Sequence, residues 1–333
     1  MAIHNKRIIG ERTGTQAGPL LIIFAEIHGN EPAGRFAIEE LFEAIDAEYS
    51  KKPDFDFRGK IVAIRGNIKA VEKNVRYIDK DLNRSWLMSE TNRILATQDT
   101  DQLDAEDQEI KEILTLINGL IAKEKPTRVV VLDLHTTTAH GGIFTIPAPT
   151  EEARRIGLAM HAPVLHGFLD GLQGTSLHYF TQENFGINMT AVCFEAGQHN
   201  CDDSPKHAVS AIINCFTAID GFYPEDIESK HDALLASKAD SLPLEANLVY
   251  IHSVVPEDAF RMKERPIYQN FDPIEKGELL AHDKNGEVLA PFGGLILMPL
   301  YQAQGSDGFF IVQEVAPRDK KNKASLNQTL AQS

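Results

Sequence analysis

Four short apolar runs, separated by amphipathic segments with helical spacing, constrain the fold of this chain more than any other feature. We expect the apolar runs to be buried strands, and they span residues 19–25, 60–66, 127–135 and 190–197. We expect the amphipathic segments to be helices, and the main ones span residues 31–49, 103–124 and 204–222. This alternation predicts an α/β fold with a mixed, mostly parallel sheet flanked by helices. Ligands of such sheets bind at the carboxyl ends of the strands.

The last third of the chain has a different pattern. Residues 225–245 are polar and typical of a connecting segment, and the apolar runs beyond them are short and β-like. Two of these runs are separated by Asn285 and Gly286, a dipeptide that favours a hairpin turn. We therefore predict a larger domain over residues 1–235, a smaller all-β domain that covers the ligand cleft over 246–316, and a mobile tail over 317–333.

The charge and the cysteine content exclude several classes of protein. The chain has 48 Asp and Glu residues against 33 Lys and Arg, which gives a formal net charge of −15. Such a surface repels phosphates and anionic lipids, so we expect neither nucleic acid nor a membrane as a partner. The three cysteines form no CxxC pair, and the N-terminus has no apolar signal segment. We expect a cytoplasmic protein, and the sequence leaves the oligomeric state open, a homo-oligomer included.

Polar residues of unusual kinds stand at the ends of the predicted strands or in the loops beside them. They form four segments, which are HGNE (28–31), RYIDKDLNR (76–84), DLHTTT (133–138) and FEAGQH (194–199). Because the carboxyl ends of parallel strands meet at the same edge of a sheet, we expect these four segments to lie together.

The first of these segments indicates a metal site. His28 and Glu31 can reach the same ion if the backbone turns at Gly29 and Asn30. The best candidate for a third ligand is His135, because it ends an apolar strand. Two imidazoles and one carboxylate leave a fourth tetrahedral position for water, which is typical of catalytic zinc. By itself the His28–Glu31 pair is more typical of a helix N-terminus with a glutamate at its positive end, and the other three segments reverse that preference.

The motifs HGNE, RYIDKDLNR, DLHTT and EAG occur in the order and spacing of a known family. The chain resembles the succinylglutamate desuccinylase/aspartoacylase family, a branch of the carboxypeptidase-like zinc hydrolases, from about residue 20 to residue 200. The resemblance implies a zinc carboxypeptidase-like fold, one Zn²⁺ per chain and a small N-acyl amino acid or a similar molecule as substrate. It also implies that the zinc ligands are His28, Glu31 and His135.

The same resemblance implies roles for residues that would act on the substrate. Glu195 matches the general base, and Arg76 matches the arginine that polarises the scissile carbonyl. Asn83 and Arg84 match a pair that grips a substrate carboxylate, for which the planar fork of an arginine is well suited. Asp81 matches the aspartate behind a histidine ligand, where it would fix the tautomer of that histidine.

Other interpretations of individual residues stay open. Glu195 also fits a structural ion pair, because a buried carboxylate without a partner is costly. Arg84 also fits a surface salt bridge in so acidic a chain. Asp133 shares a strand face with His135 and either supports that histidine or makes only an edge contact. His199 follows Glu195 by four residues, and a local structural role is more typical of such a histidine.

The sequence departs from the aspartoacylases at two places. Those enzymes have a further arginine before the catalytic glutamate, whereas no arginine occurs here from 156 through 260. Met298 stands where they have a tyrosine. We therefore do not expect N-acetylaspartate as the substrate, and the sequence gives no better support for succinylglutamate. We expect a zinc-dependent hydrolase that cleaves the amide bond of a small N-acyl amino acid or a related amide. The alternatives are a metallocarboxypeptidase acting on short peptides and a non-catalytic metal- or ligand-binding protein on the same scaffold.

Overall fold

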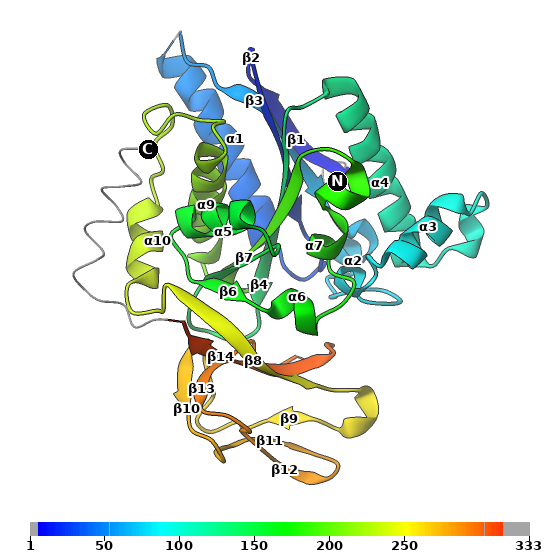
Figure 1. Ribbon diagram of the computed structural model, residues 1–333, viewed down its shortest axis with the longest axis vertical. Helices are drawn as coiled ribbons and strands as arrows, with labels where there is room; N and C mark the ends of the chain where they lie inside the picture. The colour runs from blue at the N-terminus through cyan, green and yellow to red at the C-terminus, as the bar shows by residue number, and fades with distance from the viewer. Residues whose placement is uncertain (1–5, 53, 303, 316–333) are drawn as a thin grey trace.

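The computed structural model describes residues 6–52, 54–302 and 304–315. Within these residues the chain forms an α/β fold in which helices cover both faces of a large mixed sheet (Figure 1). The four predicted strands are present as β2 (Gln16–Ala25), β3 (Arg58–Arg65), β4 (Val129–Thr137) and β7 (Met189–Gln198). The three predicted helices are present as α1 (Ala33–Lys51), α4 (Ala105–Glu124) and α9 (Ser204–Ala218).

The large sheet has 11 strands in the order β1-β3-β2-β4-β7-β5-β6-β8-β14-β13-β10. Its centre is parallel, because β3, β2, β4 and β7 are parallel to one another. The remaining strands of this sheet are β1 (Ile8–Thr13), β5 (Phe144–Pro147), β6 (Val164–His166), β8 (Glu245–Ser253), β10 (Asp272–Ile274), β13 (Gly294–Leu297) and β14 (Asp307–Glu314). The carboxyl ends of the four central strands therefore lie at one edge.

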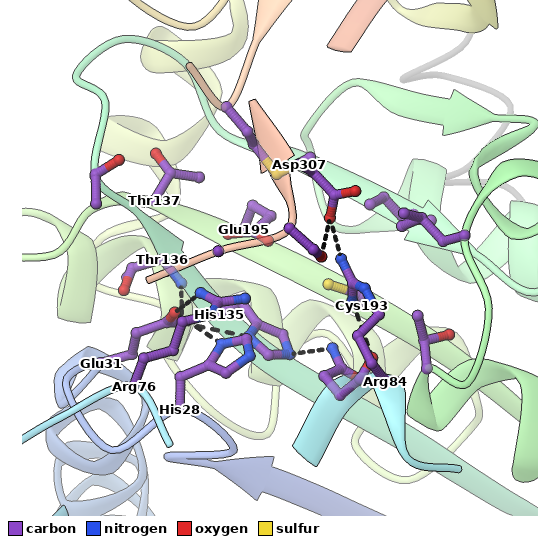
Figure 2. A pocket seen from close by; sticks show the side chains of 18 of the residues that line it. His28, Glu31, Arg76, Arg84, His135, Thr136, Thr137, Cys193, Glu195 and Asp307 are labelled. Carbon is purple, nitrogen blue, oxygen red and sulfur yellow. Dashed lines mark hydrogen bonds and ion pairs between the residues drawn. The ribbon is translucent and has the colours of Figure 1, made fainter. Parts of the chain in front are cut away.

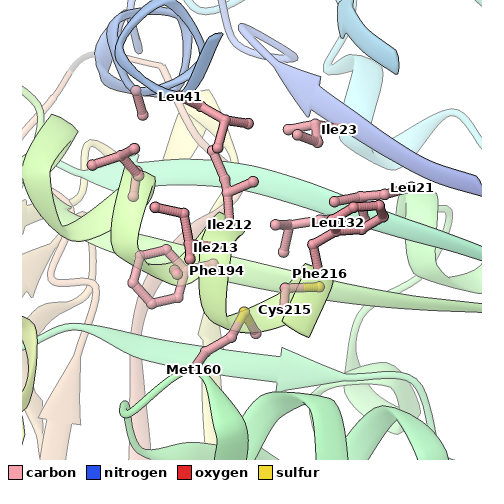
Figure 3. Packing of buried hydrophobic residues seen from close by; sticks show 14 of the residues in the cluster. Leu21, Ile23, Leu41, Leu132, Met160, Phe194, Ile212, Ile213, Cys215 and Phe216 are labelled. Carbon is pink, nitrogen blue, oxygen red and sulfur yellow. The ribbon is translucent and has the colours of Figure 1, made fainter. Parts of the chain in front are cut away.

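Both faces of the central strands are buried, which explains why their sequences are continuously apolar. Successive residues of a strand point to opposite faces, so Leu21 and Ile23 pack with α1 and α9 in one core cluster. Figure 3 shows this cluster between the sheet and the two helices. Leu20, Ile22 and Phe24 pack with α4 in a second core cluster on the other face.

Short helices fill the connections between these elements. They are α2 (Ile68–Lys73), α3 (Met88–Ala96), α5 (Glu151–Ala159), α6 (Phe168–Gly171), α7 (Ser176–Tyr179), α8 (Gln182–Phe185) and α10 (Asp232–Ala239), with single 3₁₀ turns at Leu82–Arg84, Thr100–Gln102 and Pro256–Asp258. The segment 225–245 that the sequence suggests as a connection thus contains a helix, because Leu235 and Ala239 are buried in the first core cluster. None of the described helices is long and apolar enough to cross a membrane.

The C-terminal strands continue the large sheet, since β8 pairs in parallel with β6 and in antiparallel with β14. A separate three-stranded sheet contains β9 (Arg261–Met262), β11 (Leu279–Asp283) and β12 (Gly286–Leu289). The predicted hairpin is confirmed, because Asp283 of β11 pairs with Gly286 of β12 across a tight turn. The division into domains at 235–246 stays a prediction, and the predicted tail, 317–333, lies outside the described residues.

Candidate active site

The four polar segments singled out in the sequence meet at the carboxyl edge of the central strands, where they line a cleft (Figure 2). His28 follows β2, and Glu31 stands just before α1. His135 is in β4 and pairs directly with Glu195 of the neighbouring β7. Arg76 comes from the loop between α2 and α3. The sheet thus brings side chains from distant parts of the sequence into one place.

The two histidines and Glu31 form a compact, buried group of donor atoms. Nδ1 of His28 lies 2.9 Å from Oε1 of Glu31, and Nδ1 of His135 lies 3.3 Å from Oε2. One ligand atom from each of the three residues falls within 4.8 Å of the others. The N–H of Thr136 also donates to Oε2 of Glu31, at 2.9 Å, and so fixes the carboxylate in its orientation.

The turn between His28 and Glu31 depends on a glycine. The N–H of Glu31 donates to the carbonyl oxygen of His28 at 3.1 Å, which closes the turn. The N–H of Gly29 donates to the carbonyl oxygen of Arg76 at 3.2 Å. A Cβ atom at Gly29 would lie 2.2 Å from the carbonyl carbon of Ala70 in α2, so no larger residue fits. This close approach fixes the spacing between the turn and the loop that carries Arg76.

Carboxylates stand behind both imidazoles. Nε2 of His28 lies 3.1 Å from Oδ1 of Asp81, and Nε2 of His135 lies 3.1 Å from Oδ1 of Asp133. The contact at His28 has hydrogen-bond geometry, so Asp81 holds the proton on Nε2 and leaves Nδ1 free to bind a metal, as is usual for metal-binding histidines. The contact at His135 is one of charge, because Oδ1 of Asp133 has no hydrogen-bond partner among the described residues. Both Nδ1 atoms face Glu31, so the donor set and its orientation fit Zn²⁺ with one open position.

The charges of the group also fit a cation. Burial by itself would raise the pKa of Glu31, but the two imidazoles and their hydrogen bonds hold it well below its ordinary value. Burial would lower the pKa of His135, but Asp133 and Glu31 raise it well above its ordinary value. Without a metal, a proton on His135 thus compensates the carboxylates around it. A bound divalent cation would take over this compensation.

Glu195 has the properties of a proton carrier. Its side chain is buried at the cleft, and Oε2 has no hydrogen-bond partner among the described residues. Burial raises the pKa of Glu195 to about 8, Glu31 acts in the same direction, and His135 and Arg76 oppose the shift. Buried polar atoms are nearly always paired, so an unpaired carboxylate oxygen at a cleft is typical of a group that acts on a ligand.

Arg76 lies beside the histidines rather than in solvent. Its Nε and Nη2 atoms donate to Oδ2 of Asp81 at 3.1 and 3.0 Å. Its Nη1 atom lies 3.5 Å from Oε1 of Glu31. Asp81 therefore contacts both Arg76 and His28, and it fixes their positions relative to each other.

The loop that carries these residues is fixed by Glu106, which the sequence analysis missed. This carboxylate is buried in the first turn of α4 and accepts the N–H groups of Ile78, Asp79 and Lys80 at 2.8–3.2 Å. It also accepts a hydrogen bond from the side chain of Asn67 at 2.9 Å. A glutamate near the start of a helix is common, so no sequence signal distinguishes this one.

The predicted carboxylate-binding pair already has partners in the protein. Oδ1 of Asn83 accepts the N–H of Ser176 at 2.9 Å, and its Nδ2 lies 3.2 Å from Nε2 of His135. Nη2 of Arg84 is paired with Oδ2 of Asp307 at 2.5 Å, as Figure 2 shows. Both residues line the cleft, so Asn83 and Arg84 are in reach of a ligand.

Comparison with known proteins identifies the family of the chain. The catalytic-domain model of the succinylglutamate desuccinylase/aspartoacylase family matches residues 17–201. The chain belongs to this family. No protein of curated function matches the chain in sequence comparison.

Several solved structures share the fold at low sequence identity. The succinylglutamate desuccinylase from Chromobacterium violaceum is 18% identical, with a TM-score of 0.58 over 91% of this chain and 87% of that one. The ectoine utilization protein EutE from Ruegeria pomeroyi is 16% identical, with a TM-score of 0.60 over 90% and 86%. Murine aminoacylase 3 is 18% identical, with a TM-score of 0.54 over 90% and 96%.

The rest of the cleft in this family member is formed mostly by residues that the sequence did not single out, with Met298 and His199 as exceptions. Its apolar wall contains Ile146, Leu169, Leu172, Leu177 and Phe310. Loops of the C-terminal part contribute Met298, Leu300 and Gln302, and the start of β14 contributes Asp307. His199 also lines the cleft, and its Nδ1 atom is 2.7 Å from the hydroxyl of Thr136. Ser176 donates through its hydroxyl to Oδ2 of Asp133, the carboxylate that also lies beside His135.

Proposed function

We propose that this protein is a zinc-dependent hydrolase that cleaves the amide bond of a small N-acyl amino acid or a related amide. The observation that carries the proposal is the group of donor atoms of His28, Glu31 and His135, which lie within 4.8 Å of one another in the cleft that Glu195 also lines; Oε2 of Glu195 has no hydrogen-bond partner among the described residues. Membership of a family named for deacylases supports the reaction type.

Different groups in the cleft can carry out different steps of amide hydrolysis. Zinc, when bound, supplies the Lewis acidity that lets water attack a carbonyl at neutral pH. Glu195 accepts a proton from the attacking water and later donates it to the leaving nitrogen, so that an amide and water become a carboxylic acid and an amine. The positive charge of a nearby dication favours the ionised form of Glu195, which makes it a base in the loaded site.

Arg76 and the loop around it bind the oxygen of the scissile group. Its guanidinium is held by Asp81 and lines the cleft, so it donates toward negative charge that develops on the carbonyl oxygen. Fixed donors of this kind lower the barrier because they need no reorganisation during the reaction. Asn83 and Arg84 then orient a substrate carboxylate at the mouth of the same cleft.

The proposal is tested by metal analysis together with a substrate panel. We expect one zinc per chain in protein purified without chelators, and turnover of some N-acyl amino acids that stops on chelation and returns with zinc. Short peptides in the same panel test the carboxypeptidase alternative, because the two activities share their chemistry and differ only in the pocket. Protein that holds no stoichiometric metal, or that hydrolyses only the peptides, would contradict the proposed function.

A further inference from the structure

The cleft offers little positive charge to an anionic substrate. Among the described residues that line it, the permanently charged bases are Arg76 and Arg84. Arg76 is bound through two nitrogens to Asp81. Arg84 is the arginine that remains for the substrate, and it is paired with Asp307 at 2.5 Å. The carboxylate of Asp307 therefore partly cancels the charge that one substrate carboxylate would use, and no other arginine among the described lining residues is left for a second carboxylate.

The fold holds Asp307 in this position. Asp307 begins β14, where its backbone pairs with Ser253 of β8, so it comes from the C-terminal part of the sheet. Its side chain is 15% exposed and that of Arg84 is 26% exposed, so the pair lies partly out of water. Nη1 of Arg84 donates to the carbonyl oxygen of Asn83 at 2.9 Å, which limits its freedom to turn away.

The rest of the cleft wall is apolar, which also favours an uncharged substrate group. Ile146, Leu177 and Phe310 line the cleft and belong to the second core cluster, while Leu169 and Leu172 pack against that cluster. No lysine is found among the described residues that line the cleft. A charged group placed against these side chains would lose its hydration without a partner, whereas an apolar group would gain from burial.

We infer that Asp307 is a specificity-determining residue: by neutralising Arg84 it selects N-acyl substrates with an uncharged, apolar group and rejects those with a second carboxylate. The inference rests on the proposed function and narrows its substrate class. A ligand with one carboxylate binds to Arg84, whose charge Asp307 partly cancels. The apolar part of this ligand packs against Leu169, Leu172 and Phe310. A dicarboxylate meets Asp307 as a like charge.

The first test compares turnover of N-acetylleucine and N-acetylaspartate by the zinc-loaded protein. We expect the wild type to prefer N-acetylleucine, in kcat/KM, by about tenfold or more, as a like charge in a partly buried site costs at least that factor. In Asp307→Asn the preference should fall by about tenfold, through a lower KM for N-acetylaspartate. Asp307→Glu keeps the charge and should keep the preference. Glu314→Gln removes one charge from the exposed far end of the same strand and should leave the preference unchanged.

A second test measures binding without turnover, so that it is independent of the proposed reaction. The N-methanesulfonyl derivatives of leucine and aspartate contain no hydrolysable amide, and calorimetry gives their affinities for the zinc-loaded proteins. We expect the preference for the leucine compound to fall in both Asp307→Asn and Asp307→Ser. Two variants are used so that one remains if the other folds poorly. If no N-acyl amino acid is hydrolysed, the proposed function fails, and the binding data still decide the role of Asp307. An unchanged ratio in both variants, or a wild type that prefers the aspartate compounds, would overturn the inference.

Discussion

The two sides of the cleft are built in different ways. On one side, His28, Glu31, His135 and Glu195 come from the ends of neighbouring parallel strands and are buried, with hydrogen bonds that fix most of them. On the other side, the wall comes from short helices, C-terminal loops and the strands β5 and β14, which are far apart in sequence. The difference teaches that the ends of the central parallel strands can hold the chemistry while the segments around them set the substrate, so one side can change without the other.

The largest expected effect is on the chemical side. Glu195→Gln keeps the shape of the side chain and removes the base, so we expect kcat to fall by about 10²–10⁴-fold with little change in KM. Zinc content should equal that of the wild type, because Glu195 is not among the three proposed ligands. Steady-state kinetics on the best substrate, together with metal analysis, measures both. Turnover at the wild-type rate would show that another group acts as the base.

A smaller effect on zinc affinity or activity is expected from Asp81, the carboxylate that contacts His28 and Arg76. Asp81→Asn weakens the support of His28 and Arg76, so we expect a loss of about 10–100-fold in zinc affinity or activity. Asp79→Asn is the matched control, because Asp79 lies in the same loop but accepts the N–H of Ala105 at the start of α4. Chelator competition gives the zinc affinities. Equal losses in the two variants would mean that only the stability of the loop is affected.

On the substrate side, a change should alter binding and leave the chemistry intact. Leu169→Ala removes part of the apolar wall, and we expect KM for an apolar N-acyl amino acid to rise about 3- to 20-fold, from the burial lost. The value of kcat should stay close to that of the wild type. Leu234→Ala makes the same substitution at an exposed position on α10 and serves as the control. A fall in kcat at constant KM would indicate that this wall also positions the reacting groups.

The smallest effect concerns the stability of the metal-free protein at different pH values. The folded protein holds a proton on Glu195 up to a pKa of about 8, whereas the unfolded chain releases it near 4.5. Between these values the folded state binds the extra proton, so its stability falls as the pH rises and levels off above about 8. The pKa of His135 is also raised, so its contribution to the stability of the folded state is lost as the pH rises through its own raised pKa. Glu195→Gln removes the first of these two contributions.

Thermal unfolding of metal-free protein between pH 5.5 and 8.5 measures this dependence. We expect the melting temperature of the wild type to fall more steeply than that of Glu195→Gln, by a few degrees over the range. Adding zinc should flatten the profile of the wild type, because a cation favours the ionised carboxylate. Parallel profiles for the two metal-free proteins would show that Glu195 is not the group that titrates.

The sequence predicts the central sheet well because burial on both faces leaves a continuous apolar run, as in β4, where every residue is buried. It predicts less where the signal is short or shared with solvent, as in β1, which is mostly half-buried, and in α10, where only Leu235 and Ala239 are buried. The pairing of β8 with β6 joins segments some distance apart and leaves no local pattern, so the continuity of the sheet into the C-terminal part could not be predicted.

Prediction of the candidate site from the sequence has the same limit. The spacing of His28 and Glu31 and the strand end at His135 suggest a group of ligands, and the structure brings these side chains together. Their roles, and those of Arg76, Asn83 and Arg84, stay predictions. Asp307, Ser176 and Glu106 contact the site across long stretches of chain, and an ordinary acidic or hydroxyl side chain gives no pattern from which such a contact could be predicted.

The direct pairing of His135 with Glu195 has a consequence for the folding of the protein. Because side chains alternate along a strand, a slip of β7 by a single residue would bring Phe194 to the cleft and turn Glu195 into the apolar layer under α9. The cost of burying a carboxylate there excludes the shifted pairing. The glutamate that we propose as the base thus also favours the correct register between β7 and β4, in addition to its role in the cleft.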